Sequence, residues 1–298
     1  MSQVLAAALA RLSESDGSLA ATAFTPAQRR ALHEFAQKTS ALRMKTVGRG
    51  SAYQVVDALT LAGHLRSLRP MHANDMEPGL PNRAANIAGT RNSKGAGHGH
   101  DLHYLLVKAI SDGVRWEIQR GDDLCVLDLS AATVVSGAGV LAVSDDDEWR
   151  SGQPLWLVEN QALFDRLDWM PADATGTVAY YAGQLPARLL KWIAARHRAP
   201  QVILFPDYDG VGLLNYARLR EVSPGPCSFW LMPDWQARLR TFGSHQIWKN
   251  TQVDFQSALT RLQAMGIEAD LAELCQTLSD EGLALEHESV WLSVPADG

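Results

Sequence analysis

The sequence predicts an α/β fold, in which a mainly parallel sheet flanked by helices occupies the C-terminal half of the chain. From residue 154 onward, short apolar runs alternate with helical stretches of about ten residues, which is the pattern of βαβ units. These runs are wholly apolar, as expected for strands that are covered on both faces. The pattern changes near residue 150, so we expect two regions, 1–150 and 151–298, of which the first is mainly helical.

The bulk composition is that of an ordinary soluble protein. The 298 residues are 46% hydrophobic and 20% charged. The sequence has no run of about 18 apolar residues and no signal-peptide pattern at its start, so we expect no membrane span and a cytoplasmic location. Three widely spaced cysteines without a CxxC pair suit a reducing compartment. The net charge of −6 argues against a surface that is basic throughout, but it allows local basic patches and a metal site.

Helix signals dominate the start of the chain. Residues 4–12 are rich in alanine and leucine, and the pair Thr25-Pro26 marks the start of a second helix. Apolar residues at helical spacing predict a third helix over 51–68. Residues 69–100 are rich in Pro, Gly, Asn and Arg without periodicity, so we expect a long loop that is either functional or mobile.

A short helix and several strands are expected between residues 100 and 150. Residues 104–110 predict the helix, and alternating residues predict strands over 115–119 and 124–129 with a turn between them. Residues 131–143 add further β-like sequence. Helices followed by a small hairpin resemble a winged-helix arrangement, which implies that the N-terminal region binds DNA.

The C-terminal half alternates strands with helices. We expect strands at 155–158, 177–181, 202–205 and 228–232, and helices at 162–169, 186–196, 212–221, 235–241 and 254–280. In an open α/β sheet, ligands bind beyond the carboxyl ends of the strands. Residues that directly follow these strands are therefore the candidates for a functional site.

Three carboxylates follow two of these strands. Glu159 comes directly after 155–158, and Asp207 and Asp209 follow 202–205. We expect them to meet at one edge of the sheet and to hold Mg²⁺ or Mn²⁺, because hard cations take carboxylate oxygens and offset the repulsion between clustered carboxylates. Such a metal can activate water at a phosphodiester. A DxD pair also occurs in solvated turns and at helix N-caps, and that interpretation stays open.

Four segments carry a resemblance to known proteins. They are Leu157-Val-Glu159-Asn160, Tyr180-Tyr-Ala-Gly183-Gln-Leu-Pro186-Ala-Arg188, Asp207-Tyr-Asp209-Gly-Val-Gly212 and Leu285-Glu286-His-Glu288. Together they resemble a Toprim domain, and in particular the JetD nuclease subunit of Wadjet-type bacterial SMC (condensin-like) defence systems, which is related to topoisomerase VI A subunits. The first and third segments are the diagnostic ones. The chain departs from the family pattern at Ala182 and Pro206, where glycine is frequent, and at His287, which replaces a glutamine.

The resemblance implies a metal-dependent endonuclease that cleaves double-stranded DNA, with Glu159, Asp207 and Asp209 as catalytic residues and as Mg²⁺ or Mn²⁺ ligands. It also implies an SMC/condensin-like partner complex that recognises plasmid or phage DNA, and an N-terminal half that grips the duplex. A homodimer stays open. The basic residues that we expect to contact DNA phosphates are Arg43, Lys45, Arg49, Arg91, Lys94 and Arg188.

Two other functions remain open. Tyr53 faintly resembles the nucleophile of topoisomerase VI A subunits, which would make the protein a DNA transesterase with a covalent intermediate. The alternative is that Tyr53 is an ordinary residue of an amphipathic helix. A protein of this fold could also be a non-catalytic DNA-binding or assembly subunit.

Two groups of polar residues have no settled role in the sequence. His98, His100 and His103 could hold zinc, but they could also lie in a flexible polar loop. Glu286 and Glu288 could approach the acidic site from the end of the chain, or they could lie on the surface.

Overall fold

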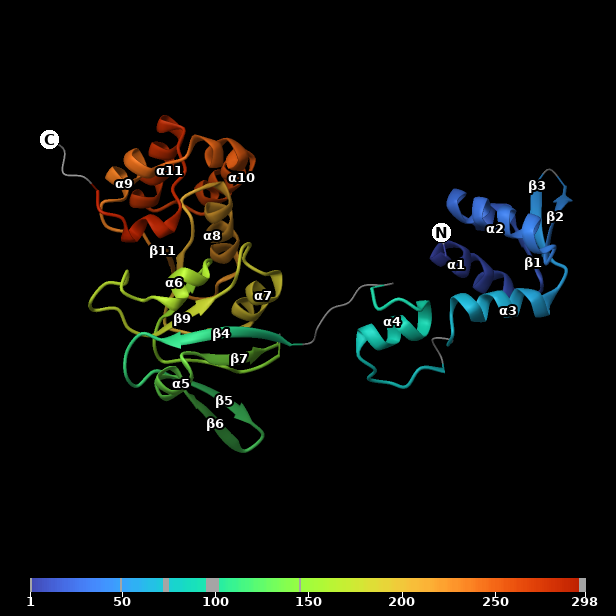
Figure 1. Cartoon of the computed structure of the whole chain (residues 1–298), viewed down its shortest axis with the longest axis horizontal. Helices are drawn as coiled ribbons and strands as arrows, with labels where there is room; N and C mark the ends of the chain where they lie inside the picture. The colour runs from blue at the N-terminus through green and yellow to red at the C-terminus, as the bar shows by residue number, and fades with distance from the viewer. Residues whose placement is uncertain (1, 49, 72–74, 95–101, 145, 295–298) are drawn as a thin grey trace. The chain divides into compact units, whose positions relative to one another are not determined.

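The chain divides into two compact units, Met1–His100 (unit 1) and Asp101–Gly298 (unit 2) (Figure 1). Each unit has a hydrophobic core of its own. The division lies earlier in the chain than the boundary expected near residue 150, because two strands that precede residue 150 belong to the sheet of unit 2. The computed structural model describes residues 2–48, 50–71, 75–94, 102–144 and 146–294.

Unit 1 packs helices against a small antiparallel sheet. The strand order in this sheet is β1-β3-β2, and leucines of three helices, Leu9, Leu32 and Leu61, lie in its core. The described elements are α1 (Ser2–Ser13), β1 (Ser18–Ala20), η1 (Ala21–Ala23), α2 (Pro26–Thr39), β2 (Leu42–Val47), β3 (Gly50–Val55), α3 (Ala58–Leu68) and α4 (Asn82–Thr90).

Helix α2 begins where the sequence predicts. The Thr25 side chain accepts a hydrogen bond from the backbone N–H of Gln28, and the Gln28 side chain accepts one from the backbone N–H of Thr25. This reciprocal capping box gives acceptors to two backbone N–H groups. Pro26, at the first helical position, has no N–H and needs no acceptor.

The helix predicted over 51–68 is wrong in its first part. Strand β3 occupies the start of this range and pairs with β2, so that Tyr53 lies opposite Met44. Helix α3 begins only after Asp57, whose carboxylate accepts a hydrogen bond from the backbone N–H of Thr60. A run of apolar residues can serve the end of a strand as well as the start of a helix, so the periodicity alone could not separate the two.

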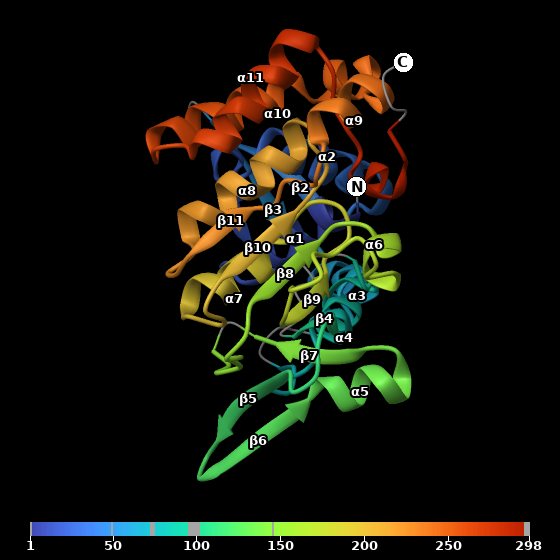
Figure 2. The ribbon, with the colours of Figure 1, turned by 90° about the vertical axis from the view of Figure 1, so that its left-hand side faces the viewer.

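Unit 2 is built on a mixed sheet of six strands, which confirms the α/β class. The strand order is β11-β10-β8-β9-β4-β7; the pairs from β11 to β9 are parallel and the two pairs made by β4 are antiparallel (Figure 2). The strands are β4 (His103–Ala109), β7 (Gly139–Val143), β8 (Leu155–Val158), β9 (Thr177–Tyr180), β10 (Val202–Phe205) and β11 (Cys227–Phe229). The predicted strands at 155–158, 177–181 and 202–205 are therefore confirmed.

Helices connect and cover these strands, and the long helix α10 packs along α8. In the described residues they are α5 (Leu129–Ser136), α6 (Gln161–Asp165), α7 (Ala187–Ala195), α8 (Gly210–Val222), α9 (Trp235–Phe242), α10 (His245–Ala264) and α11 (Ala269–Glu281), followed by the short helix η3 (His287–Trp291). None of the helices in the described part of the chain is both long enough and apolar enough to cross a membrane.

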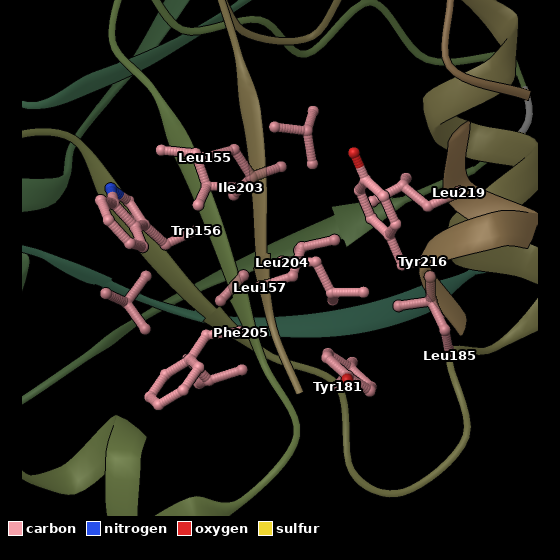
Figure 3. Packing of buried hydrophobic residues seen from close by; sticks show 14 of the residues in the cluster. Leu155, Trp156, Leu157, Tyr181, Leu185, Ile203, Leu204, Phe205, Tyr216 and Leu219 are labelled. Carbon is pink, nitrogen blue, oxygen red and sulfur yellow. The ribbon is translucent and has the colours of Figure 1, made fainter. Parts of the chain in front are cut away.

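The parallel strands are buried on both faces, as their apolar sequences predict. In Figure 3, Trp156 and Phe205 point to one side of strands β8 and β10. Leu204 points to the other side, where Tyr216 and Leu219 of α8 pack. This two-sided core fixes the ends of β8 and β10, from which the candidate site is built.

Two expectations for residues 104–143 are wrong. The segment 104–110 is strand β4 instead of a helix: it pairs with β9 and β7, and every second residue (Leu105, Val107 and Ala109) is buried on one face of the sheet. The start of 131–143 belongs to helix α5 instead of a strand. Asp128 caps that helix through the backbone N–H of Ala131.

The hairpin predicted over 115–129 is confirmed as β5 (Arg115–Arg120) and β6 (Asp123–Asp128). It belongs to unit 2 together with α5. It therefore belongs to a different compact unit from the N-terminal helices, with which the sequence pattern predicts a winged-helix arrangement.

Candidate functional site

Two neighbouring strands end at the same edge of the sheet and bring two acidic residues together. Strands β8 and β10 are parallel, with Val158 opposite Phe205 at their carboxyl ends. Glu159 follows β8 directly and Asp207 follows β10, so both leave the sheet on the same side. Both line one pocket of about 250 Å³ at this edge, and the residues that complete its lining are Asn160, Gln161, Tyr180, Gly183 and His287.

A short antiparallel bridge brings the end of the chain to this pocket. The backbone N–H of Tyr208 donates to the carbonyl oxygen of Leu285 (2.8 Å), and the N–H of Leu285 donates to the carbonyl oxygen of Tyr208 (3.1 Å). Two residues further, the backbone N–H of His287 donates to Oδ1 of Asp207 at 2.9 Å. Residues 286–288 therefore lie directly beside the end of β10.

Among the described residues, Asp207, His287 and Glu288 form the one group of three potential metal ligands that lie close together. One ligand atom from each lies within 4.8 Å of the others. The imidazole of His287 is 1% exposed; its Nδ1 lies 3.1 Å from Oδ1 of Asp207 and its Nε2 lies 3.6 Å from Oε2 of Glu288. Neither ring nitrogen makes a hydrogen bond of acceptable geometry. Burial lowers the pKa of His287, so the ring is neutral near pH 7.

Asp209 lies close to these residues but has a structural task as well. Its Oδ1 accepts a hydrogen bond from the backbone N–H of Gly212 at 2.8 Å and so caps helix α8. Its side chain does not line the pocket, although its charge acts on Glu159. Asp209 is therefore an N-cap residue, which is the alternative that the sequence leaves open for the DxD pair. Its other carboxylate oxygen takes no part in this cap.

The glycines beside Asp209 are required by close packing. A Cβ atom on Gly210 would collide with the carbonyl oxygen of Thr251 in α10 and would come within 2.6 Å of the backbone nitrogen of Phe255. A Cβ atom on Gly212 would collide with the carbonyl oxygen of Asp207. The tight turn from β10 into α8, and with it the position of Asp207, depends on both glycines.

The electrostatics of the pocket favour a cation. Burial, and then the charges of Asp207 and Asp209, raise the pKa of Glu159 to about 8, against the effect of a hydrogen bond from Tyr181. Burial raises the pKa of Asp207 to about 6, although the backbone N–H of His287 acts in the opposite direction. Burial likewise raises the pKa of Asp209 to about 6. These shifts mean that ionising all three groups is costly unless a positive charge lies among them.

Polar neighbours hold the acidic side chains in place. The hydroxyl of Tyr181, a residue 4% exposed, donates to Oε2 of Glu159 at 3.3 Å. The side-chain amide of Asn160 donates to Oε1 of Glu288, and its oxygen accepts from the backbone N–H of Ala162 at the start of α6. Hydrogen bonds of this kind hold the acidic side chains in the orientation that binding requires.

The loop after β9 contains two consecutive residues with positive φ. Ala182 has a φ of 56° and Gly183, which lines the pocket, has a φ of 68°. Alanine adopts this left-handed conformation at a cost, since its Cβ crowds the backbone. Ala182 is one of two positions at which the sequence departs from a glycine frequent in the resembling family, and the loop keeps the glycine-like conformation there.

The predicted DNA-contacting residues lie in several places. Arg43 and Lys45 are exposed on β2, Lys94 is exposed, and Arg91 is exposed with its Nε donating to the carbonyl oxygen of Ser67 (2.6 Å). Arg49 lies outside the described residues. Arg188 is half-buried on α7 and does not line the acidic pocket.

Arg188 acts instead on a histidine of β4. Burial lowers the pKa of His103, and the charge of Arg188 adds to this effect. Of the three histidines that could hold zinc, His98 and His100 lie outside the described residues.

The position of Tyr53 argues against a role as nucleophile. It lies on strand β3 instead of the predicted helix, it is 3% exposed, and its hydroxyl donates to the carbonyl oxygen of Arg29 at 3.1 Å. Burial also raises its pKa, which disfavours the phenolate that an attack on phosphate requires.

The sequence pattern thus names Glu159 and Asp207, which the structure brings together, and Asp209, which lies beside them. It leaves Glu288 open and misses His287 as a potential ligand. A carboxylate cluster with one imidazole can bind a divalent cation. No protein-family model and no curated protein matches the chain, so the chemistry of this pocket has to be inferred from its geometry.

Proposed function

We propose that this protein is a metal-dependent endonuclease of the Toprim type that cleaves double-stranded DNA. The observation that carries the proposal is the convergence of Glu159 and Asp207 from two adjacent parallel strand ends into one pocket, with the charge of Asp209 close by. Mg²⁺ or Mn²⁺ bound there would stabilise the charge that develops on the phosphodiester and assist the ionisation of water.

The residues of the chain then have distinct tasks. Asp207 holds the cation, and Asp209 contributes its negative charge while fixing the start of α8. Burial and the neighbouring carboxylates raise the pKa of Glu159, and a cation bound beside it would lower that pKa, so that the ionised carboxylate could take a proton from the attacking water. Tyr181 orients Glu159 through its hydroxyl.

The distribution of charge between the two units supports a nucleic-acid substrate. Residues 1–100 contain 12 lysines and arginines against 6 aspartates and glutamates, a net charge of +6. The remaining residues contain 15 against 27, a net charge of −12. Unit 1 is thus suited to neutralise DNA phosphates, whereas unit 2 repels DNA unless a cation or another protein offsets its charge. A partner complex of the SMC type would supply that help.

The surface of unit 1 offers a specific face for DNA. Helix α2 exposes Arg29, Arg30 and, about one turn later, His33, and Arg43 and Lys45 are exposed on the strand that follows it. A helix with basic and hydrogen-bonding side chains, followed by an antiparallel hairpin, is an arrangement that winged-helix proteins use on duplex DNA. We therefore place the duplex against α2 and β2.

Incubation of supercoiled plasmid with the protein tests the proposal. We expect nicked or linear DNA in the presence of Mg²⁺ or Mn²⁺ and intact plasmid when EDTA is added. The cleaved ends should be free of protein after denaturation, and Tyr53→Phe should cut as well as the unmodified protein. DNA binding without metal-dependent cleavage would instead support the non-catalytic assembly subunit, and protein joined to a DNA end would support the transesterase.

Removing two positive charges from the proposed DNA face should weaken binding in a salt-dependent way. For Arg30→Ala combined with Lys45→Ala, we expect the slope of log affinity against log salt concentration to fall by about two, since each lost phosphate contact removes about one counterion. Fluorescence anisotropy with a labelled duplex measures this slope. Lys249→Ala changes an exposed lysine of unit 2 and should leave the slope unchanged; equal effects of both variants would contradict the assignment.

A further inference from the structure

The imidazole of His287 is buried beside carboxylates, and neither of its nitrogens makes a hydrogen bond of acceptable geometry. Nearly all of the His287 side chain is shielded from solvent. Buried polar atoms in proteins are almost always paired, so an unpaired buried imidazole calls for a missing partner. The groups that face the two nitrogens are all acceptors: the carboxylates of Asp207 and Glu288, and the backbone carbonyl oxygen of Pro206, which also lies near the ring.

A divalent cation satisfies this arrangement better than a proton does. Bonds of about 2.2 Å to a cation separate two opposite ligand atoms by about 4.4 Å. The ligand atoms of Asp207, His287 and Glu288 lie within 4.8 Å of one another, which is close to the spacing of ligands around one cation. One nitrogen would bind the cation and the other would donate to a carboxylate, the usual arrangement of metal-bound histidines.

We infer that His287 is a metal ligand together with Asp207 and Glu288, and that this pocket consequently takes a first-row transition cation such as Mn²⁺ in preference to Mg²⁺. Magnesium prefers oxygen ligands, whereas an imidazole nitrogen favours transition metals. The inference deepens the proposed function, because it specifies the cation of the same pocket. It also gives a role to His287, the residue of the segment Leu285-Glu286-His-Glu288 that replaces the glutamine of the resembling family.

The neighbours of His287 show that the ring is held for this purpose. Its backbone N–H is bound to Asp207, and the ring lies 5.4 Å from the ring of Phe205 at the end of β10. On the other side, Glu288 is fixed by the amide of Asn160. The imidazole is therefore held beside both carboxylates by residues at the end of β10 and at the N-cap of α6.

Spin-echo spectroscopy of bound Mn²⁺ tests the ligand directly. We expect the Mn²⁺ complex of the full chain to show ¹⁴N couplings typical of a coordinated imidazole, and His287→Gln to bind Mn²⁺ without them. His197→Gln is the matched control, since His197 is exposed on the loop that precedes β10, at the opposite end of that strand. Absence of ¹⁴N couplings in the unmodified protein would overturn the inference without any variant.

Titration calorimetry with Mn²⁺ and with Mg²⁺ tests the preference. We expect Mn²⁺ to bind at least about tenfold more tightly than Mg²⁺, and this ratio to fall toward one in His287→Gln. An unchanged ratio in the variant would refute the preference. These outcomes are separate from the fate of the endonuclease: ¹⁴N couplings without DNA cleavage would reject the proposed function alone, and Mg²⁺-dependent cleavage without ¹⁴N couplings would reject the role of His287 alone.

Discussion

Glu159→Gln should lower metal-dependent DNA cleavage by about a thousandfold or more. The substitution keeps the size of the side chain and its contact with Tyr181, but it removes both a negative charge beside the cation and the group that accepts a proton from water. Initial rates of plasmid cleavage at saturating metal measure the effect. Glu273→Gln makes the same chemical change at an exposed position of α11 and should cleave at the unmodified rate. A Glu159→Gln protein that retains normal cleavage would remove Glu159 from the site.

The same substitution should stabilise the metal-free protein at neutral and alkaline pH. The pKa of Glu159 is about 8 in the folded protein, well above its ordinary value of 4.5. Between these values the folded chain keeps a proton that the unfolded chain releases, so the stability of the metal-free protein falls as the pH rises across this window. Glutamine has no charge to lose, so the Tm of the variant should exceed that of the unmodified protein most clearly near pH 8. A loss of cleavage together with a gain in Tm would exclude unfolding as its cause.

Gly210→Ala should destabilise unit 2 by more than about 3 kcal/mol, because a rigid backbone contact leaves no room for a methyl group. The new Cβ would meet the backbone of α10 at Thr251 and Phe255, so that α8 and α10 would have to separate. Both helices are well buried along this contact, and neither backbone can give way as a flexible side chain would. Thermal or urea unfolding followed by circular dichroism measures the loss.

Gly152→Ala is the matched control for this prediction. Gly152 also lies in unit 2, and a Cβ atom there would meet nothing within 4 Å. We expect its stability to change by less than about 1 kcal/mol. If both alanine variants unfolded at the same denaturant concentration, the close approach of α8 and α10 at Gly210 would be refuted.

The parts of the site that are local in sequence could be predicted, and the parts that depend on distant pairing could not. Strands β8 and β10 have wholly apolar sequences, and the residues after them, Glu159 and Asp207, follow from the general geometry of parallel sheets. His287 and Glu288 reach the pocket through the bridge between Tyr208 and Leu285. That bridge involves only one residue on each side and leaves no periodic signal in the sequence.

The predictions of secondary structure and of the domain boundary failed for a related reason. The segments 51–55 and 104–110 were ambiguous because a short apolar run fits a strand or a helix, and the neighbouring strand decides between them. The domain boundary expected near residue 150 is the point at which strands and helices begin to alternate regularly. Strands β4 and β7 precede that point but pair at the edge of the same sheet, so the actual division lies at residues 100 and 101.

The bridge to Leu285 also has a consequence for the protein while it is being made. Asp207 leaves the ribosome 80 residues before His287, with which it makes its hydrogen bond. A nascent chain that has been translated only as far as α11 can fold its sheet but lacks the segment that closes the pocket. If the cation is held as we infer, unfinished chains lack His287 and Glu288, so the complete set of ligands forms only at the end of synthesis.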